Sequence, residues 1–203
     1  MIPKRVLDLF CGAGGAAMGL HRAWPEAEIV GVDIKPQPRY PFHFRLANAL
    51  HYPLDGFDFV WASPMCQSHS WAARRWKKVW PDQIAAVRER LAGIPHTIEN
   101  VVGAPLLSPV RLCGMMFNLR VIRHRLFECS FPVIEPNHPK CSGAISRGEA
   151  YTVAGHGAES KSYRYQDWAD AMGIQWMTKI ELTQSVPPAY SEYIARQFSK
   201  YEK

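Results

Sequence analysis

The stretch Arg5-Val-Leu-Asp-Leu-Phe-Cys-Gly-Ala-Gly-Gly15 decides the fold class. Its apolar first half, residues 5–10, is typical of a short buried strand, and the glycines after it predict a tight turn. Residues 16–23 have the apolar spacing of a helix, and residues 28–33 predict a second strand that ends in a carboxylate. A strand, a glycine turn, a helix and another strand begin a doubly wound, mostly parallel α/β sheet.

The turn and the second strand predict a cofactor that contains adenosine. Asp33 lies about twenty residues past the glycines, the interval expected for an acid that binds ribose hydroxyls. Residues 12–17 also satisfy the dinucleotide pattern G-x-G-x-x-A, so a nicotinamide or flavin oxidoreductase remains an alternative. Asp8, inside the first strand, is unusual for that pattern. It would suit a cofactor with an ammonium group, as S-adenosylmethionine has.

A cysteine follows the next buried strand. The apolar run 57–62 predicts this strand, Pro64 ends it, and Cys66 comes directly after. Open α/β sheets place their chemistry at the carboxyl ends of such strands, so Cys66 is a candidate nucleophile, although a lone cysteine is more often a small apolar filler. A helix over 82–92 and a strand over 96–101 come next. The latter would bring Glu99 to the same edge.

Composition indicates one ordinary globular domain. The chain has 203 residues, of which 47% are hydrophobic and 21% charged, and five cysteines at irregular positions, which favours free thiols. A net charge of +6 and a pI of about 9.1 are compatible with a polyanionic partner. We find no signal-peptide pattern at the N-terminus and no apolar run of the roughly 20 residues that cross a bilayer. We therefore expect a cytoplasmic monomer with no membrane partner.

Five short motifs resemble those of the DNA cytosine-5 methyltransferases, in the order of that family. They are Asp8-Leu-Phe-Cys-Gly-Ala-Gly-Gly15, Pro64-Met-Cys-Gln67, Glu99-Asn-Val101, Arg123-His-Arg125 and Gln184-Ser-Val-Pro-Pro188. Each motif is short, but five in order from residue 5 to about 198 make coincidence improbable. The chain is most similar to the small methylases that bacteriophages encode, so the location expected is a bacterial or phage-infected cell.

The resemblance implies a Rossmann-like methyltransferase fold and a reaction. S-adenosylmethionine would donate a methyl group to C5 of a flipped-out cytosine in double-stranded DNA, through a covalent bond between Cys66 and C6. Glu99 would hydrogen-bond the exocyclic amine and N3, and Arg125 would contact O2 of the base. Arg123 or Arg125 would also lower the pKa of Cys66. Water is the expected acceptor of the C5 proton.

The resemblance also assigns binding residues. The expected cofactor-binding residues are Asp8, Phe10, Cys11, Gly12, Ala13, Gly14, Gly15, Asp33, Ile34, Asn48, Ala49, Gln184 and Ser185. The segment 67–80 is rich in cations and tryptophans and has no acidic residue, so it matches the family's DNA-clasping loop. Its expected DNA-binding residues are Gln67, Ser70, Trp71, Arg74, Arg75, Trp76, Lys77 and Lys78. The alternative is an exposed amphipathic helix with a solvated basic face.

The chain divides into a catalytic core, 1–130, a reduced target-recognition region, 131–165, and a part that returns to the core, 166–203. Prolines and glycines break the strand-helix rhythm in the middle region. Its small size predicts a recognition sequence of a few base pairs, or dependence on an accessory protein for specificity. Cys129, His138 and Cys141 hint at zinc, but a fourth clear ligand is missing from the pattern, so we expect no metal.

Four positions depart from the family pattern. Met65 replaces the proline before the nucleophile, His69 an aromatic residue, Asn48 an acid and Gln184 an asparagine. These differences leave two alternatives open beside the DNA methyltransferase. One is a catalytically silent homologue that binds DNA, and the other is an RNA (tRNA) cytosine-C5 methyltransferase.

Overall fold

The protein is built around one seven-stranded sheet, seen in a computed structural model that describes residues 2–70, 79–153 and 164–201. The strands are β1 (Arg5–Leu9), β2 (Glu28–Asp33), β3 (His43–Leu46), β4 (Phe59–Ala62), β5 (His96–Asn100), β6 (Val110–Leu112) and β7 (Arg125–Cys129). The helices are α1 (Gly15–Ala23), α2 (Ile84–Arg90), α3 (Tyr165–Met172), α4 (Lys179–Gln184) and α5 (Pro188–Tyr201), with a 3₁₀ helix, η2 (Gly114–Phe117).

The strand order defines the fold class. It runs β3-β2-β1-β4-β5-β7-β6, with the first five strands parallel and β7 antiparallel to both of its neighbours. The order reverses between β1 and β4, which is the point where open α/β sheets bind their ligands. This is a doubly wound, mostly parallel, Rossmann-like sheet, and it confirms the predicted α/β fold class. The antiparallel β6–β7 pair was outside the sequence prediction.

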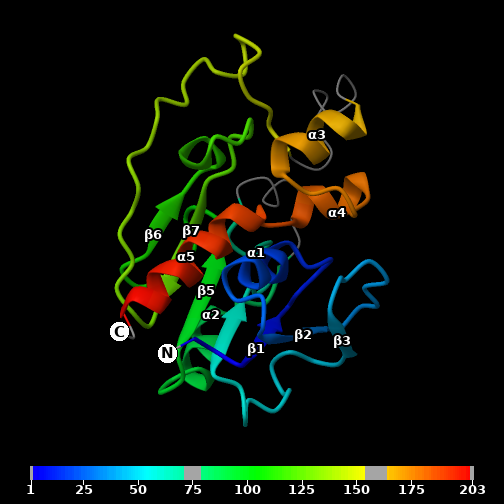
Figure 1. Cartoon of the computed structure of the whole chain (residues 1–203), viewed down its shortest axis with the longest axis vertical. Coiled ribbons are helices and arrows are strands. Elements are labelled where there is room, and N and C mark those ends of the chain that lie inside the picture. The colour runs from blue at the N-terminus through cyan, green and yellow to red at the C-terminus, as the bar shows by residue number, and fades with distance from the viewer. Residues whose placement is uncertain (1, 71–78, 154–163, 202–203) are drawn as a thin grey trace.

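Helices cover both faces of the sheet (Figure 1). α1 and α5 lie side by side on one face, where the Trp24 ring packs edge-on against Phe59 and Phe198 at 5.1 and 5.9 Å between centroids. α2 covers the other face through the buried side chains of Ile84 and Val87. Such burial of large apolar side chains from both layers is the main favourable contribution to folding, so the sheet is a rigid platform for its carboxyl edge.

The predicted elements over 1–130 exist, with bounds that differ from the expected ones by at most two residues. The strand expected over 57–62 begins at Phe59, and the helix expected over 82–92 runs over Ile84–Arg90. The helix begins later because the Asp82 carboxylate, just before it, accepts a hydrogen bond from the backbone N–H of Ile84 at 3.0 Å. Each difference lies at an element boundary, where sequence patterns are least decisive.

The region after β7 is irregular, as the prolines and glycines predict. Residues 131–153 contain no helix and no strand, and run along the β6 edge of the sheet as the yellow-green segment of Figure 1. The backbone N–H of Arg111 donates to Glu135 at 2.8 Å, and Tyr193 donates its hydroxyl to the carbonyl of Ile134 at 2.8 Å. This segment is therefore attached to both β6 and α5. The division into three parts remains a prediction.

Across the described residues, the helices fall short of the length and apolar character that a bilayer crossing requires.

Candidate active site

The glycine turn joins β1 to α1 in the conformation that its sequence predicts. Phe10, Gly12 and Gly14 have φ values of 58°, 49° and 84°, the left-handed region in which glycine is preferred. Asp33 at the end of β2 organises the turn, because its carboxylate accepts hydrogen bonds from the backbone N–H of Gly12 at 3.1 Å and of Lys35 at 2.9 Å. A methyl group added at Gly12 would meet no atom within 4 Å, so the space in front of the turn is open to a ligand.

A buried carboxyl group lies beside this turn. Asp8 is fully buried in β1, and its Oδ2 accepts a hydrogen bond from the hydroxyl of Tyr40 at 3.3 Å. The Tyr40 ring fits there because Gly31 leaves room for it on β2. Oδ1 of Asp8 has no hydrogen-bond partner among the described residues, and burial raises the pKa of the carboxyl group to about 8. An orphaned acceptor at this place fits a ligand that brings a cation or a donor.

Residues 176–186 pack onto the same turn. Gly15 has no space for a side chain, because a methyl group there would collide with Oγ of Ser185 and the carbonyl of Val186. Trp176 donates its indole N–H to the carbonyl of Ala13 at 2.9 Å. Ser185 is thus brought to the turn as expected. Trp176 and Tyr40 are contacts that the sequence reasoning missed, since no local pattern marks them.

Other expected cofactor residues lie around this edge with mixed exposure. Ile34 is 70% exposed, and Asn48 and Gln184 are also exposed. Ala47 donates its N–H to the carbonyl of Asp33 at 3.0 Å, so Asn48 and Ala49 follow β3 at the edge where β2 ends. Oδ1 of Asn48 accepts from the N–H of Leu50 at 3.0 Å, which gives this side chain a turn-forming role. Cys11 is buried, with its N–H bound to the carbonyl of Val32 at 3.1 Å.

Cys66 lies on the loop after β4, half-buried, and its carbonyl accepts hydrogen bonds from the N–H groups of His69 and Ser70 at 3.1 and 2.8 Å. The side chain of Asn100, at the end of β5, donates to the carbonyl of Pro64 at 3.0 Å and accepts from the N–H of Val101 at 2.9 Å. Asn100 therefore holds the loop that carries Cys66 against β5.

A carboxylate and a guanidinium lie next to the thiol. Glu99 on β5 is 7% exposed, and its Oε1 is 3.0 Å from Nε of Arg125 at the start of β7. Burial raises the pKa of Glu99, while Arg125 and Arg123 lower it. The antiparallel β5–β7 pairing produces this contact, because it places the beginning of β7 opposite the end of β5.

Burial and Glu99 raise the pKa of the Cys66 thiol above its ordinary value, whereas Arg125 and Arg123 lower it. The arginines thus act in the expected direction, but the net shift is upward because burial outweighs them. Burial thus favours the neutral thiol of Cys66 over the reactive thiolate.

Arg123 is buried near Cys66 and Glu99, and hydrogen bonds to backbone carbonyls hold its side chain in place. It is 6% exposed and donates to the carbonyls of Val153 at 2.6 Å and Thr183 at 2.8 Å, while its own carbonyl accepts the hydroxyl of Tyr190 at 2.7 Å. Burial lowers its pKa to about 9. These contacts fit a positioning residue better than a group that touches a base.

Most of the expected DNA-binding residues lie outside the residues that the structure describes. Those that lie outside the described residues are Trp71, Arg74, Arg75, Trp76, Lys77 and Lys78. Gln67 and Ser70 are described and half-buried, and lie one and four residues after Cys66. His69, a departure from the family pattern, has its Nε2 3.1 Å from Oδ1 of Asp82.

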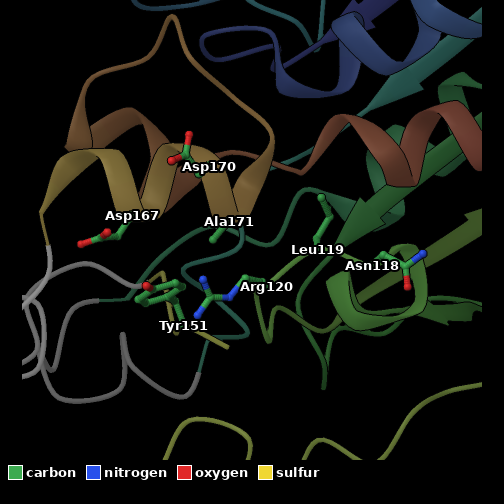
Figure 2. A pocket seen from close by; sticks show the side chains of 7 residues that line it. All are labelled: Asn118, Leu119, Arg120, Tyr151, Asp167, Asp170 and Ala171. Atoms are coloured by element: carbon green, nitrogen blue, oxygen red, sulfur yellow. The ribbon is translucent and has the colours of Figure 1, made fainter. Parts of the chain in front are cut away.

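A pocket of about 230 Å³ lies away from these groups (Figure 2). Leu119 and Arg120 line it together with Asp167 and Asp170 of α3. Arg120 lies over the ring of Tyr151 at 5.2 Å. The lining contains none of the residues expected to act on a cofactor or a base.

Comparisons with known proteins give partial matches. No protein-family model matches the chain. Trans-aconitate 2-methyltransferase of Rhodopseudomonas palustris (strain BisB18) is 38% identical over 73 residues, which are 32% of this chain and 28% of that protein. The chain thus matches less than a third of that curated relative's length.

Solved methyltransferases give weak structural matches. The plantazolicin methyltransferase BpumL in complex with SAH has a TM-score of 0.36 at 14% identity, over 49% of this chain and 39% of that one. An RNA methyltransferase from Salinibacter ruber in complex with S-adenosyl-L-homocysteine has a TM-score of 0.37 at 14% identity, over 68% of this chain and 84% of that one. Similarity at this level carries no argument about substrate.

Proposed function

We propose that this chain is an S-adenosylmethionine-dependent methyltransferase and that its substrate is C5 of a flipped-out cytosine in double-stranded DNA. One observation carries the proposal. Cys66 follows β4, Glu99 lies near the end of β5 and Arg125 begins the antiparallel β7, so the three residues share one edge of the sheet, beside the switch point where the glycine turn opens. A thiol, a carboxyl group that can be protonated and a guanidinium are the groups that C5 methylation of cytosine requires.

The glycine turn and its neighbours would hold the donor. The open space before Gly12 admits a ligand close to the backbone, and Asp33 lies where it can accept from ribose hydroxyls. The unpartnered Oδ1 of Asp8 is suited to the ammonium group of the methionine part. When bound, S-adenosylmethionine supplies an electrophilic methyl group on a sulfonium.

Cys66 would activate the base. Its thiolate adds to C6 of cytosine, and the electron pair released into the ring makes C5 a nucleophile toward the methyl group. After methyl transfer, a base, with water as our candidate, removes the C5 proton. The C6–S bond then breaks and returns the electron pair to the sulfur of Cys66. The balance is one cytosine and one donor giving 5-methylcytosine, S-adenosylhomocysteine and a proton.

Glu99 would select cytosine and stabilise the charged ring. Its raised pKa favours a protonated carboxyl group, which can donate to N3 while the second oxygen accepts from the exocyclic amine. Thymine offers no such amine. Arg125, held at 3.0 Å from Glu99, would donate to O2 of the same base.

A mechanism-based trap tests this proposal. We would incubate the protein with S-adenosylmethionine and duplex DNA that contains 5-fluorocytosine, whose fluorine cannot leave as the proton does. We expect a covalent protein–DNA complex, together with 5-methylcytosine by mass spectrometry when unmodified unmethylated DNA is the substrate. Cys66→Ala should lose both products completely. Cys129→Ser is the matched control, because Cys129 packs against Thr97 outside the site and should keep both products.

Three outcomes would contradict the proposal. Binding of DNA and S-adenosylhomocysteine without product or trapped complex would support a silent homologue. Methylation of a tRNA transcript in preference to duplex DNA would move the substrate to RNA. Product formation by Cys66→Ala would remove Cys66 as the nucleophile.

A further inference from the structure

Four metal-binding side chains from distant parts of the chain meet near the start of β7. Cys113 follows β6, His124 directly precedes β7, and His138 and Cys141 belong to the irregular segment 131–153. Cys113 is buried and the other three are half-buried. Their ligand atoms all lie within 4.8 Å of one another, which is a Cys₂His₂ set.

Four of the six separations between the ligand atoms are close to those around one tetrahedral ion. Zinc bonds of about 2.3 Å to sulfur and about 2.0 Å to nitrogen require separations of about 3.8 Å for S···S, about 3.3 Å for N···N and about 3.5 Å for S···N. The observed separations are 3.7 Å between the two Sγ atoms and 3.2 Å between Nε2 of His124 and His138. Sγ of Cys141 lies 3.9 Å from Nε2 of His124 and 3.3 Å from Nε2 of His138.

We propose that Cys113, His124, His138 and Cys141 bind one zinc ion at a structural site. Four protein ligands complete a tetrahedron, so this site leaves no open position for a substrate and is structural rather than catalytic. Two thiolates and two imidazoles favour zinc over calcium or magnesium, which prefer oxygen ligands. A two-iron cluster would need its ligands divided between two irons, whereas these four atoms all lie within 4.8 Å of one another.

The proposed zinc site would attach the irregular segment 131–153 to the edge of the sheet where β7 begins. His124 lies between Arg123 and Arg125 in the chain, and neighbouring side chains of an extended segment point to opposite sides. The two arginines interact with Glu99 and Cys66, while His124 turns toward the cluster. Zinc would thus hold the backbone that carries Arg125 and, through His138 and Cys141, hold segment 131–153 beside it.

The sequence alone does not reveal this set. Cys129, which the spacing suggested as a ligand, lies elsewhere, with its sulfur 3.4 Å from the hydroxyl of Thr97. The ligands that replace it, Cys113 and His124, reach the cluster through the antiparallel pairing of β6 with β7. That pairing has no signature in the local pattern.

Metal analysis of the whole protein tests the proposal. We would express it with added zinc, purify it without chelators, and measure metals by mass spectrometry after exhaustive dialysis. We expect about one zinc ion per chain. Replacement by Co²⁺ should produce the intense visible bands of a tetrahedral ion and a thiolate-to-cobalt charge-transfer band. Both measurements use the wild-type protein, so they do not depend on whether a variant folds.

Variants then assign the ligands. Cys141→Ser and His138→Gln lie on the irregular segment, and each should weaken zinc affinity by at least about 10- to 100-fold, as even outer-sphere changes do. Cys129→Ser is the matched cysteine control and should keep the ion. Chelation of the wild type should speed proteolysis within 131–153, a readout independent of methyl transfer.

Any of four results would overturn the proposal. They are less than a tenth of a zinc ion per chain, a cobalt spectrum without thiolate charge transfer, a disulfide between Cys113 and Cys141 in the purified protein, and equal loss of zinc from Cys129→Ser and Cys141→Ser.

Discussion

At the scale of single residues, the site balances two opposing electrostatic effects on one thiol. Burial and the Glu99 carboxylate favour the neutral thiol of Cys66, and the two arginines favour the thiolate. Because Glu99 is itself buried with a raised pKa, its own protonation removes one obstacle to ionisation of Cys66. In the proposed mechanism, Cys66 would stay unreactive until a base and its hydrogen bonds enter the pocket.

Site-specific alkylation checks this balance. The rate at which iodoacetamide modifies Cys66, followed by peptide mass spectrometry across pH, reports its thiolate fraction. Glu99→Gln should shift the profile to lower pH, because the carboxylate that opposes ionisation is gone. Arg125→Gln should shift it to higher pH. Shifts in the same direction for both variants would contradict the assignment.

The buried carboxyl group of Asp8 leads to a second prediction, which concerns the free energy of unfolding. Its pKa is about 8 in the folded protein against an ordinary value of 3.8, so the folded state holds the proton more tightly than the unfolded state. This contribution to stability is complete below about pH 4 and is lost as pH rises to about 8.

At pH 8 the free energy of unfolding of Asp8→Asn, measured with urea, should therefore exceed that of the wild type by on the order of a few kcal/mol. The two proteins should differ little at pH 4. The same variant should bind S-adenosylhomocysteine more weakly if Asp8 receives the ammonium group. A variant that is less stable at pH 8 would refute the linkage.

At the scale of elements, the closing segment and the glycine turn form one unit. The side chain of Ser185 and the backbone of Val186 fill the space beside Gly15. The first residue of α1 therefore has to be a glycine, which has no side chain to collide with them. Trp176 adds its hydrogen bond to Ala13. The shape of the turn thus depends on residues near the other end of the chain.

Two alanine substitutions separate the roles of these glycines. Gly15→Ala should destabilise the protein by roughly 1–3 kcal/mol, because the added methyl overpacks the contact with Ser185. Gly12→Ala has open space but a left-handed φ, and should cost roughly 1–2 kcal/mol while it blocks the approach of the donor.

Urea unfolding and calorimetric titration with S-adenosylhomocysteine measure both effects. For Gly12→Ala, the loss of affinity should exceed what its loss of stability predicts. Unchanged binding by that variant would place the donor elsewhere.

Sequence patterns predict the features that depend on residues close together in the chain. Apolar runs bounded by glycine and proline locate β1, β2, β4 and β5, and the position of Cys66 after a buried run places it at the working edge. Long-range pairing is the part that patterns miss. The antiparallel β7 brings Arg125 to Glu99, the pairing of β4 with β5 brings Asn100 to Pro64, and neither contact follows from a spacing.

At the scale of the whole molecule, the excess of cations bears on the proposed DNA complex. Lys and Arg number 24 against 18 for Asp and Glu, and Arg74, Arg75, Lys77 and Lys78 are four of them. Contacts with phosphates release counterions, so affinity should fall steeply with salt. Replacement of these four by glutamine would leave 20 cations against 18 acids, a net charge of +2.

The variant should bind duplex DNA with a shallower dependence on salt. Each lost phosphate contact lowers the slope of log affinity against log salt by about 0.9, so up to about 3.6 for all four. Fluorescence anisotropy across a salt series gives the slope. As a control, Lys4→Gln lies at the amino end of β1, away from the site, and should leave the slope nearly unchanged. An unchanged slope in the fourfold variant would exclude this segment from the interface.

The partnership of α1 with α5 has a consequence for synthesis on the ribosome. Ser191 donates to the carbonyl of Ala16 across 175 residues, and Trp24 donates to Ser199 over the same separation. At roughly 5–20 residues per second, α1 emerges about 9 to 35 s before the helix that covers it. For that interval the nascent chain exposes the apolar face of α1, so the core on this face of the sheet can form only after α5 has left the ribosome.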